Sequence, residues 1–215
     1  MIKINKGREP LAWTRKKSTP NFTEYVPIKG LRDQLLIEQG YICAFCMRTI
    51  PAIDPNVNEI SKIEHLKSRK DRPDLQLDFN NMVICCPGNT DNNPHCDKLK
   101  DGNSVSFDPF GSALQNSISY NSKNGEIISS NPIWNDEFKR LLNLNHNRIK
   151  VNRVIALNGV IEEIFKKGKT SFDLNKKLRE WKELNKDGKL KPYCGIVIWY
   201  LQKKLRNTRN PQLLP

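Results

Sequence analysis

Five of the six cysteines lie close together in the sequence, with a spacing that suits a bound metal ion. Cys43 and Cys46 form a C-x-x-C pair, in which two intervening residues allow one turn to present two thiolates to the same metal. A second pair requires Cys96 together with either Cys85 or Cys86. Four thiolates are typical of a structural zinc site, and buried, metal-free thiols are the alternative interpretation.

Two further residues bear on this zinc prediction. His95 directly precedes Cys96 and is the main competitor as a ligand. Cys194 stands alone far downstream, in the apolar run PYCGIVIWYL, and we therefore expect it in the hydrophobic core.

Glu64 and His65 stand side by side between the cysteine pairs, and Asp97 directly follows the fifth cysteine. Such residues can hydrolyse a phosphodiester, because a neutral histidine accepts a proton from water and two carboxylates hold a divalent cation. We predict that His65 is the general base and that Glu64 and Asp97 bind a catalytic Mg²⁺ or Mn²⁺. The plainer alternatives are a solvated Glu-His pair and an aspartate that only favours the start of a helix.

The charge balance favours a polyanionic partner. The chain has 36 Lys and Arg against 23 Asp and Glu, which gives a net charge of +13 and favours nucleic acid as a partner. Simple solubility or an acidic protein partner would explain the same charge. Six basic residues near the predicted site are placed to contact phosphates, namely Lys67, Arg69, Lys70, Arg72, Lys98 and Lys100.

The sequence predicts a cytoplasmic protein without a membrane segment. Its first residues, MIKINKGREPLAW, lack the apolar stretch of a secretory signal. No apolar run approaches the roughly 20 residues that cross a bilayer. In that compartment, six cysteines argue against a disulfide framework and for metal binding or structural thiols.

Several short elements must position these residues. We expect an extended basic arm up to about Asn21 and a helix over 28–39, which ends before Gly40. A strand that ends at His65 and a second apolar strand, NMVICC, follow. A short helix is predicted from about His95 to Gly102.

The second half of the chain is predicted to be mainly helical. A hairpin with Asn124-Gly125 at its turn precedes it. Val151, Val154, Ile155 and Ile161 have the spacing of a buried helix face. The predicted helical segments are 136–145, 147–167, 171–185 and 193–206.

Four short motifs resemble those of HNH endonucleases of the ββα-metal type with a zinc knuckle: CAFC, IEHLKS, NNMVICC and HCDKLK, within residues 41–102. In that family the first cysteine of the second pair lies five residues after an asparagine, which selects Asn81 and Cys86. The resemblance implies that Asn81 orients His65 through its backbone or ring. Two departures stand out: nine residues separate Cys86 from Cys96, more than in many members, and Asp97 replaces the commoner His or Asn.

A second resemblance covers most of the chain with less specific motifs. KGREPLAW, LRDQLLIEQGYICAFCMRTI and LLNLNHNRIKVNR are similar to the HNH subunits of Septu and retron-associated anti-phage systems. Such proteins work beside an ABC- or SMC-like (PtuA-like) ATPase subunit, which the resemblance implies here too.

The predicted fold class is α+β, with a zinc-stapled ββα-metal HNH core and a mainly helical C-terminal region. We divide the chain into a basic N-terminal arm (1–27), a nuclease core (28–104) and a hairpin with a helical scaffold or partner-binding region (105–215). DNA is the leading substrate. The alternatives are a ribonuclease that cleaves tRNA and a non-catalytic zinc module that binds nucleic acid or protein.

Overall fold

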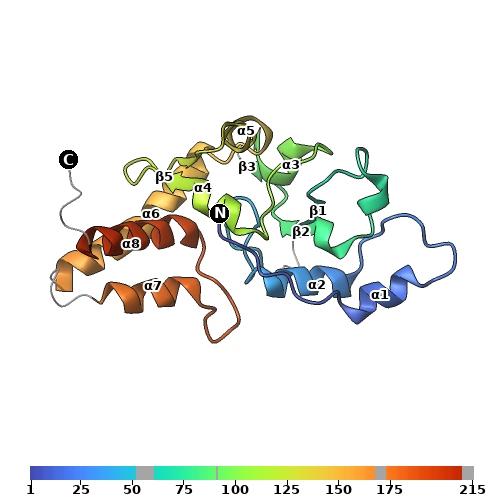
Figure 1. Cartoon of the computed structure of the whole chain (residues 1–215), viewed down its shortest axis with the longest axis horizontal. Coiled ribbons are helices and arrows are strands. Elements are labelled where there is room, and N and C mark those ends of the chain that lie inside the picture. Colours follow the sequence, from blue (N-terminus) through green and yellow to red (C-terminus); the bar gives the residue numbers. More distant parts are fainter. Residues whose placement is uncertain (52–60, 91, 168–172, 210–215) are drawn as a thin grey trace.

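A computed structural model of the chain describes residues 1–51, 61–90, 92–167 and 173–209. The molecule is elongated, with the first helices and the β1–β2 hairpin at one end and the last three helices at the other (Figure 1). The described strands form three separate two-stranded antiparallel sheets, and helices make up much of the rest. The predicted α+β class is confirmed at this level.

The hairpin at the centre of the first half was predicted correctly. β1 ends at His65, and β2 pairs with it in antiparallel fashion, so that Glu64 lies opposite Val83 and His65 opposite Met82. Two further two-residue strands, β3 and β4, pair with each other after β2, and a short helix follows them. The elements are β1 (Lys62–His65), β2 (Met82–Cys85), β3 (Asn89–Thr90), β4 (Asn93–Pro94) and α3 (Cys96–Lys100).

The predicted first helix is present as α2 (Lys29–Glu38), which packs against β2. Gly40 follows it with φ +58°, the left-handed conformation that glycine adopts without strain. The buried amide of Gln39 joins the helix to the strand. Its Nε2 donates to the carbonyls of Ile42 (3.0 Å) and Ile84 (2.7 Å), and its Oε1 accepts from the Ile84 amide (2.8 Å). These bonds hold β2 in place against the end of α2.

The prediction of an extended N-terminal arm was wrong. Residues Leu11–Lys17 form a helix, α1, which begins after Pro10. Trp13 on this helix is fully buried, and its indole N–H donates to the carbonyl of Leu77 at 3.1 Å. Ile4 is buried too. A large aromatic side chain that buries its ring and satisfies its N–H therefore anchors this basic segment to the core.

The second half begins with the predicted hairpin, in which Gly125 adopts φ +74° at the turn. The helix expected over 136–145 begins and ends four residues earlier, because α5 starts at Pro132 and a π-helical turn, Glu137–Leu141, ends it. No helix within the described ranges is long and apolar enough to cross a membrane. The elements are α4 (Ser112–Ser117), β5 (Ile118–Tyr120), β6 (Ile127–Ser129), α5 (Pro132–Asp136), α6 (Asn147–Lys167), α7 (Leu174–Lys182) and α8 (Cys194–Arg209).

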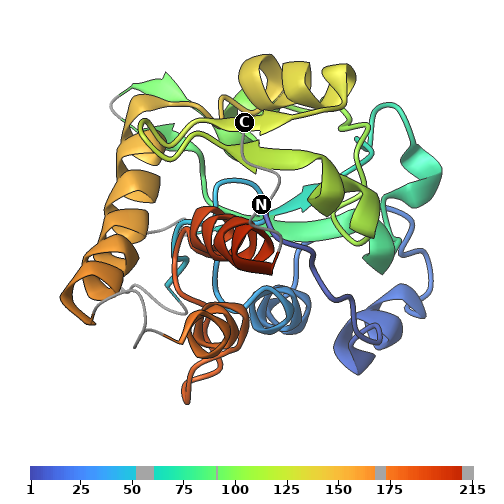
Figure 2. The ribbon, with the colours of Figure 1, turned by 60° about the vertical axis from the view of Figure 1, so that its left-hand side comes forward.

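Helix α8 packs against α6, α7 and β5 and forms the centre of the helical end, as Figure 2 shows. Its first residue, Cys194, is buried in the core as predicted. The predicted buried face of α6 was wrong for Val151 and Ile155, which are 55% and 63% exposed, whereas Val154 and Ile161 are partly buried. The helix instead turns inward a face that includes Arg153, which is fully buried.

The contacts of Arg153 explain this choice of face. Its Nη1 donates to the carbonyl of Gly125 at 3.1 Å, and its guanidinium lies 5.7 Å from the ring centroid of Tyr120. A buried arginine needs such partners, and the β5–β6 hairpin supplies both. The apolar members of the buried face are Ile149, Leu157, Val160 and Ile164.

Candidate functional site

Four of the cysteines meet at one point, as the sequence predicted. The Sγ atoms of Cys43, Cys46, Cys86 and Cys96 all lie within 4.8 Å of one another, and all four side chains are buried. They come from the turn after α2, the end of β2 and the first residue of α3. A group bound here would therefore join three elements that are far apart in the sequence.

The turn that carries the first pair is closed by its own backbone. The amide of Cys43 donates to the carbonyl of Arg48 (2.9 Å), and the amide of Met47 donates to the carbonyl of Cys43 (3.0 Å). Met47 adopts φ +64°, which reverses the chain and leaves both sulfur atoms on the inner side. A bridge between Ile42 and Thr49 completes the knuckle.

The distances within this cluster fit zinc. The Sγ atoms of Cys43 and Cys96 are 4.0 Å apart, and those of Cys46 and Cys86 are 3.8 Å apart. A tetrahedral zinc with Zn–S bonds of about 2.3 Å has S–S edges of about 3.8 Å. A disulfide would need about 2.05 Å, and all four cysteines are free. The cluster thus has the size of a tetrahedral metal site.

The electrostatics of the cluster also favour a cation. Burial by itself would raise the pKa of Cys43, but hydrogen bonds from the thiols of Cys46, Cys86 and Cys96 hold it well below its usual range. The hydrogen bond with Cys43 raises the pKa of Cys86, and burial raises the pKa of Cys96, so without a metal the cluster favours one thiolate, the form of cysteine that binds metals, among neutral thiols.

The structure separates the two open alternatives for this site. Cys85 and Cys86 are consecutive, and side chains alternate between the two faces of an extended segment. Cys86 joins the four-sulfur cluster, whereas Cys85 lies with Glu64. His95 stands beside the cluster, with its Nδ1 3.2 Å from the Sγ of Cys96. His95 is thus a neighbour of a sulfur ligand, and the four cysteines form the ligand set.

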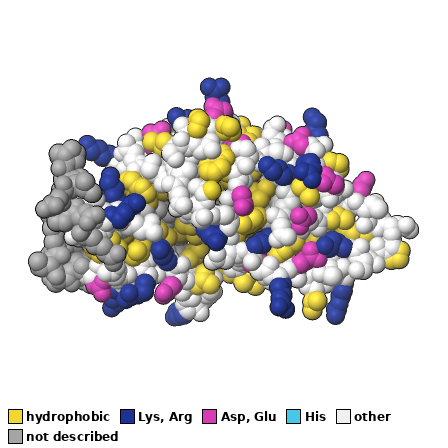
Figure 3. Space-filling model, in the orientation of Figure 1, with side chains coloured by type: hydrophobic (Ala, Val, Ile, Leu, Met, Phe, Trp, Pro, Cys, Tyr) yellow, Lys and Arg dark blue, Asp and Glu magenta, His cyan; other side chains and the backbone are white. Residues whose placement is uncertain are grey.

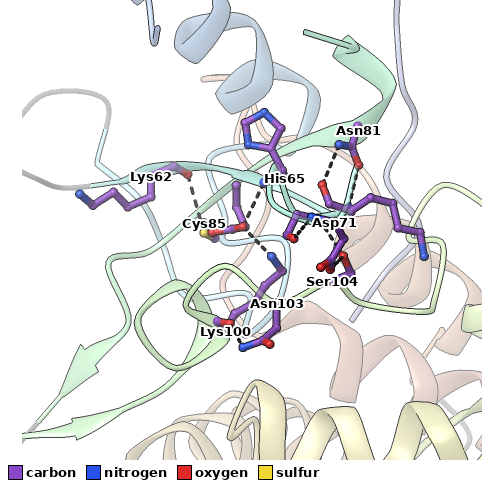
Figure 4. Close-up of polar contacts among 11 residues, drawn as sticks. Lys62, His65, Asp71, Asn81, Cys85, Lys100, Asn103 and Ser104 are labelled. Atoms are coloured by element: carbon purple, nitrogen blue, oxygen red, sulfur yellow. Dashed lines mark hydrogen bonds and ion pairs between the residues drawn. The ribbon is translucent and has the colours of Figure 1, made fainter. Parts of the chain in front are cut away.

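A second cluster combines Glu64, Cys85 and Asp97, whose ligand atoms lie within 4.8 Å of one another. Figure 4 shows this region, in which Glu64 Oε1 accepts from the backbone amide of His65 (3.0 Å) and from Nζ of Lys100 (2.7 Å). Burial, and then the nearby Glu64 carboxylate, raise the pKa of Asp97 to about 7. Two carboxylates this close favour a shared cation, which would remove their repulsion. Burial raises the pKa of Cys85, so it is a neutral thiol here.

The predicted phosphate contact of Lys100 was wrong. Its side chain is fully buried, and its ammonium forms an ion pair with Glu64, whose side chain is 13% exposed. Lys100 ends α3, three residues after Asp97, and points back to the carboxylates. It acts as an internal counter-charge at the carboxylate cluster.

We expect Lys100→Met to lower the free energy of unfolding by about 3 to 5 kcal/mol in the absence of divalent cations. The substitution leaves the Glu64 carboxylate buried beside Asp97 without the ammonium that now compensates it. Adding Glu64→Gln should restore part of the loss, because it removes the uncompensated charge. Urea unfolding of the single and double variants measures both effects. Lys98→Met, on the exposed side of the same helix, is the matched control and should change stability by less than about 0.5 kcal/mol.

His65 directly follows Glu64 at the end of β1 and is buried, and Figure 4 shows its ring on the other side of the strand from Cys85 and Lys100. Its Nε2 lies 3.0 Å from the carbonyl oxygen of Gln76, which can only accept, so the proton of a neutral ring sits on Nε2. Nδ1 then carries the lone pair. Burial lowers the pKa of His65 below 6.5, which keeps the imidazole neutral at pH 7. The ring of Tyr25 packs edge-on against it, with 4.6 Å between centroids.

Asn81 acts on the loop after β1 rather than on the ring of His65. Its Oδ1 accepts from the amide of Lys67 (2.8 Å), and its Nδ2 donates to the carbonyls of Lys67 (2.9 Å) and Leu75 (3.2 Å). Figure 4 shows the Asn81 amide directed at this loop. Since Gln76 follows Leu75, Asn81 helps to place the carbonyl that binds His65. The expected orienting role therefore takes an indirect form.

Four of the predicted phosphate contacts are exposed side chains. Lys67 is more restrained, because its Nζ donates to the carbonyl of Val105 at 2.8 Å. The guanidinium of Arg69 lies 5.3 Å from the ring centroid of Tyr25, so it stands near His65. Figure 3 shows that lysine and arginine side chains are spread over the visible face rather than gathered in one stripe. The exposed four are Arg69, Lys70, Arg72 and Lys98.

Sequence analysis missed three residues of this site. Gln76 contributes through its backbone carbonyl, which no residue type reveals. Tyr25 lies 40 positions before the histidine that it contacts, and no motif connects the two. Cys85 was considered only as a zinc ligand, although alternation along the strand would have placed it on the face of Glu64.

Comparison with known proteins assigns no family to this chain, because no protein-family model and no curated protein matches it. The functional argument therefore depends on the two clusters. Adjacent residues of one strand end, Cys85 and Cys86, belong to different clusters, so the two sites lie close together on opposite sides of the chain.

Proposed function

We propose that this chain is a metal-dependent endonuclease of the HNH type, which hydrolyses phosphodiester bonds of nucleic acid, with DNA as the leading substrate. The observation that carries the proposal is the Glu64–Asp97 carboxylate pair in a candidate cation site, with the buried, neutral His65 as the next residue after Glu64. The antiparallel β1–β2 pair and the short helix α3, which carry Glu64 and Asp97, are compatible with the ββα arrangement that the resemblance implies, with β3 and β4 inserted between β2 and α3. The four-cysteine cluster supports a structural zinc in the same unit.

Each residue has a distinct role in the proposed reaction. Glu64 and Asp97 would hold a Mg²⁺ or Mn²⁺ ion, which when bound stabilises the negative charge on the phosphate and on the departing oxygen. His65 accepts the proton of the attacking water through Nδ1, the nitrogen that keeps its lone pair. The Gln76 carbonyl fixes this tautomer and the ring orientation, as a hydrogen-bond partner of the other ring nitrogen commonly does. Arg69 is exposed near the ring and would contact a phosphate of the strand.

The proposed zinc has a structural role in this scheme. It would hold the knuckle, the end of β2 and the start of α3 together. Asp97 directly follows the ligand Cys96, so the position of the carboxylate depends on the position of the sulfur. Zinc would thereby keep Asp97 next to Glu64.

The proposal includes a role in anti-phage defence beside an ABC- or SMC-like ATPase subunit, for which the sequence resemblance is the main support. The helical half would carry the partner surface. Val151, Ile155 and Phe165 on α6 are 55%, 63% and 75% exposed, which is compatible with a protein contact there.

Incubation with plasmid DNA and with tRNA tests the proposal. Zinc-loaded protein is supplied with Mg²⁺ or Mn²⁺, with and without a candidate ABC- or SMC-like ATPase subunit, and compared with Glu64→Gln. Cleavage that depends on Glu64 supports the nuclease, and the cleaved substrate decides between DNA and RNA. Equal cleavage by both proteins would contradict it. Nucleic-acid binding without cleavage, with zinc retained, would favour the non-catalytic zinc module.

The raised pKa of Asp97 predicts how cation binding depends on pH. A carboxyl with a pKa of about 7 is mostly protonated at lower pH, and the proton must leave before the oxygen can bind a cation. We expect the apparent affinity for Mn²⁺ to fall by up to about tenfold for each pH unit below 7 and to level off above it. Titrations followed by electron paramagnetic resonance measure this slope. Asp97→Asn should bind Mn²⁺ more weakly and lose most of the slope, so an unchanged slope would exclude Asp97 as its cause.

A further inference from the structure

We infer that a pocket beside the cysteine cluster binds the phosphate group of a nucleotide, free or at the end of a nucleic-acid strand. The pocket has a volume of about 670 Å³, within the range of small-molecule sites. It lies between the knuckle, β3, the first turns of α6 and the residue before α8. It shares no residue with the carboxylate cluster. The polar residues that line it are Arg48, Asn89, His95, Arg148, Asn152 and Tyr193.

The charge of the pocket suits an anion. Arg48 comes from the knuckle and Arg148 from the first turn of α6, and both have exposed side chains at the pocket wall. None of the described residues that line the pocket is acidic, and the first turn of α6 contains no acidic residue. A guanidinium group can donate two parallel hydrogen bonds to the oxygens of one phosphate. The start of the 21-residue helix α6 adds partial positive charge. Two arginines from separate elements can thus approach one phosphate from two sides.

The remaining walls suit a nucleoside. The Tyr193 amide donates to the carbonyl of Met47 (2.9 Å), and its hydroxyl accepts from Nδ2 of Asn152 (3.0 Å), so both ends of the residue are held. Ile149 and Val151 add apolar surface to the same pocket. A fixed aromatic ring next to apolar and amide side chains can contact a base and a sugar. These walls favour a nucleotide over inorganic phosphate, which has neither group.

Arg148 is the decisive residue for a test. Arg48 stands two positions after Cys46, so negative thiolates lie near it and offset part of its charge, and its substitution could disturb the cluster. Arg148 lies on α6, away from the cysteine knuckle in sequence. Arg179 on α7 is an exposed arginine outside the pocket, so Arg179→Gln is a matched control that also removes one positive charge.

Calorimetric titration of the zinc-loaded chain, without added Mg²⁺ or Mn²⁺, tests the inference. The probes are thymidine monophosphate against thymidine, and a single-stranded oligothymidylate with and without a 5′-phosphate. We expect the phosphorylated probe to bind more tightly, and Arg148→Gln to weaken it about tenfold while Arg179→Gln leaves it within about twofold. Zinc content is measured for each variant to show that the cluster is intact.

The outcomes separate the sources of the phosphate. An Arg148-dependent preference for thymidine monophosphate over thymidine assigns the pocket to a free nucleotide. If only the oligonucleotide shows an Arg148-dependent preference for the 5′-phosphorylated form, the pocket is assigned to a strand end. Failure of both phosphorylated probes to bind, no preference for phosphate, or equal weakening by Arg148→Gln and Arg179→Gln overturns the inference. Because no cleavage is measured, each of these results leaves the proposed nuclease activity to its own test.

Discussion

Cys86→Ala is expected to release zinc from the chain, whereas Cys85→Ala, one residue earlier, is expected to keep about one zinc per chain. Cys86 is one of four sulfur atoms of a tetrahedral cluster, and Cys85 belongs to the carboxylate cluster. Structural zinc sites contribute about 10 to 16 kcal/mol of binding free energy that is coupled to folding. Whole domains are stable by only about 5 to 15 kcal/mol, so loss of the site should unfold the surrounding part of the chain.

The two adjacent alanine variants control for one another. Both remove a buried thiol from nearly the same place, and cavity formation alone should cost each of them about 1 kcal/mol. Metal analysis and thermal unfolding of the purified variants measure the difference. Equal zinc content in both variants would mean that the four-cysteine cluster does not bind zinc as proposed.

His65→Ala is expected to reduce the rate of nucleic-acid cleavage by about 10²- to 10⁴-fold, the usual contribution of a general base. The variant removes Nδ1, the only atom of this residue assigned to proton transfer. Single-turnover cleavage with saturating divalent cation measures the chemical step. The zinc content should stay unchanged, because His65 is not a member of the four-cysteine cluster.

Gln76→Ala is the matched variant for this prediction. It keeps the backbone carbonyl that accepts from His65 and removes a side chain that bonds only to Thr23 and Tyr25. We therefore expect a cleavage rate within about threefold of the wild type, since a loop substitution away from the reacting groups has a small effect. A loss as large as that of His65→Ala would mean that packing of the loop, rather than proton transfer, limits the rate.

The four-cysteine cluster could be predicted from sequence because most of its signal is local. A C-x-x-C turn needs only a few residues to define its geometry, and Cys86 was selected over Cys85 by its spacing from Asn81. The hairpin and α3 followed from short apolar runs, and Gly40 marked the end of α2. Each of these features depends on neighbouring residues, which a sequence displays directly.

The errors concern contacts between distant segments. Lys100 has the sequence context of a surface lysine, and only the fold shows that its ammonium turns back to Glu64. The basic N-terminal segment contains one tryptophan, Trp13, whose burial outweighs the surrounding charges. On α6, apolar spacing allowed two faces, and the β5–β6 hairpin selected the one that contains Arg153. The spacing of apolar residues along a helix shows which of its faces are apolar, but not which other element of the fold will pack against them.

The opposite orientations of Cys85 and Cys86 have a consequence for folding, because the strand that carries them has the sequence NNMVICC. If β2 slipped by one residue against β1, Asn80 would take the place of Asn81 and Cys85 the place of Cys86. All four residues of β2 are buried, so apolar alternation does not oppose the slip. The doubled asparagines and cysteines would let the misaligned hairpin keep both of its polar anchors.

Phe79, which precedes the strand, distinguishes the two alignments. It is 2% exposed, and the ammonium of Lys6 lies 3.5 Å from its ring centroid. The slip would move this ring to the exposed position of Asn80, at a cost of about 1.5 to 3 kcal/mol for the lost burial. The alignment of β2 against β1 therefore depends on an aromatic residue that belongs to neither cluster, and a metal bound at the cysteines early in folding would hold whichever alignment is present.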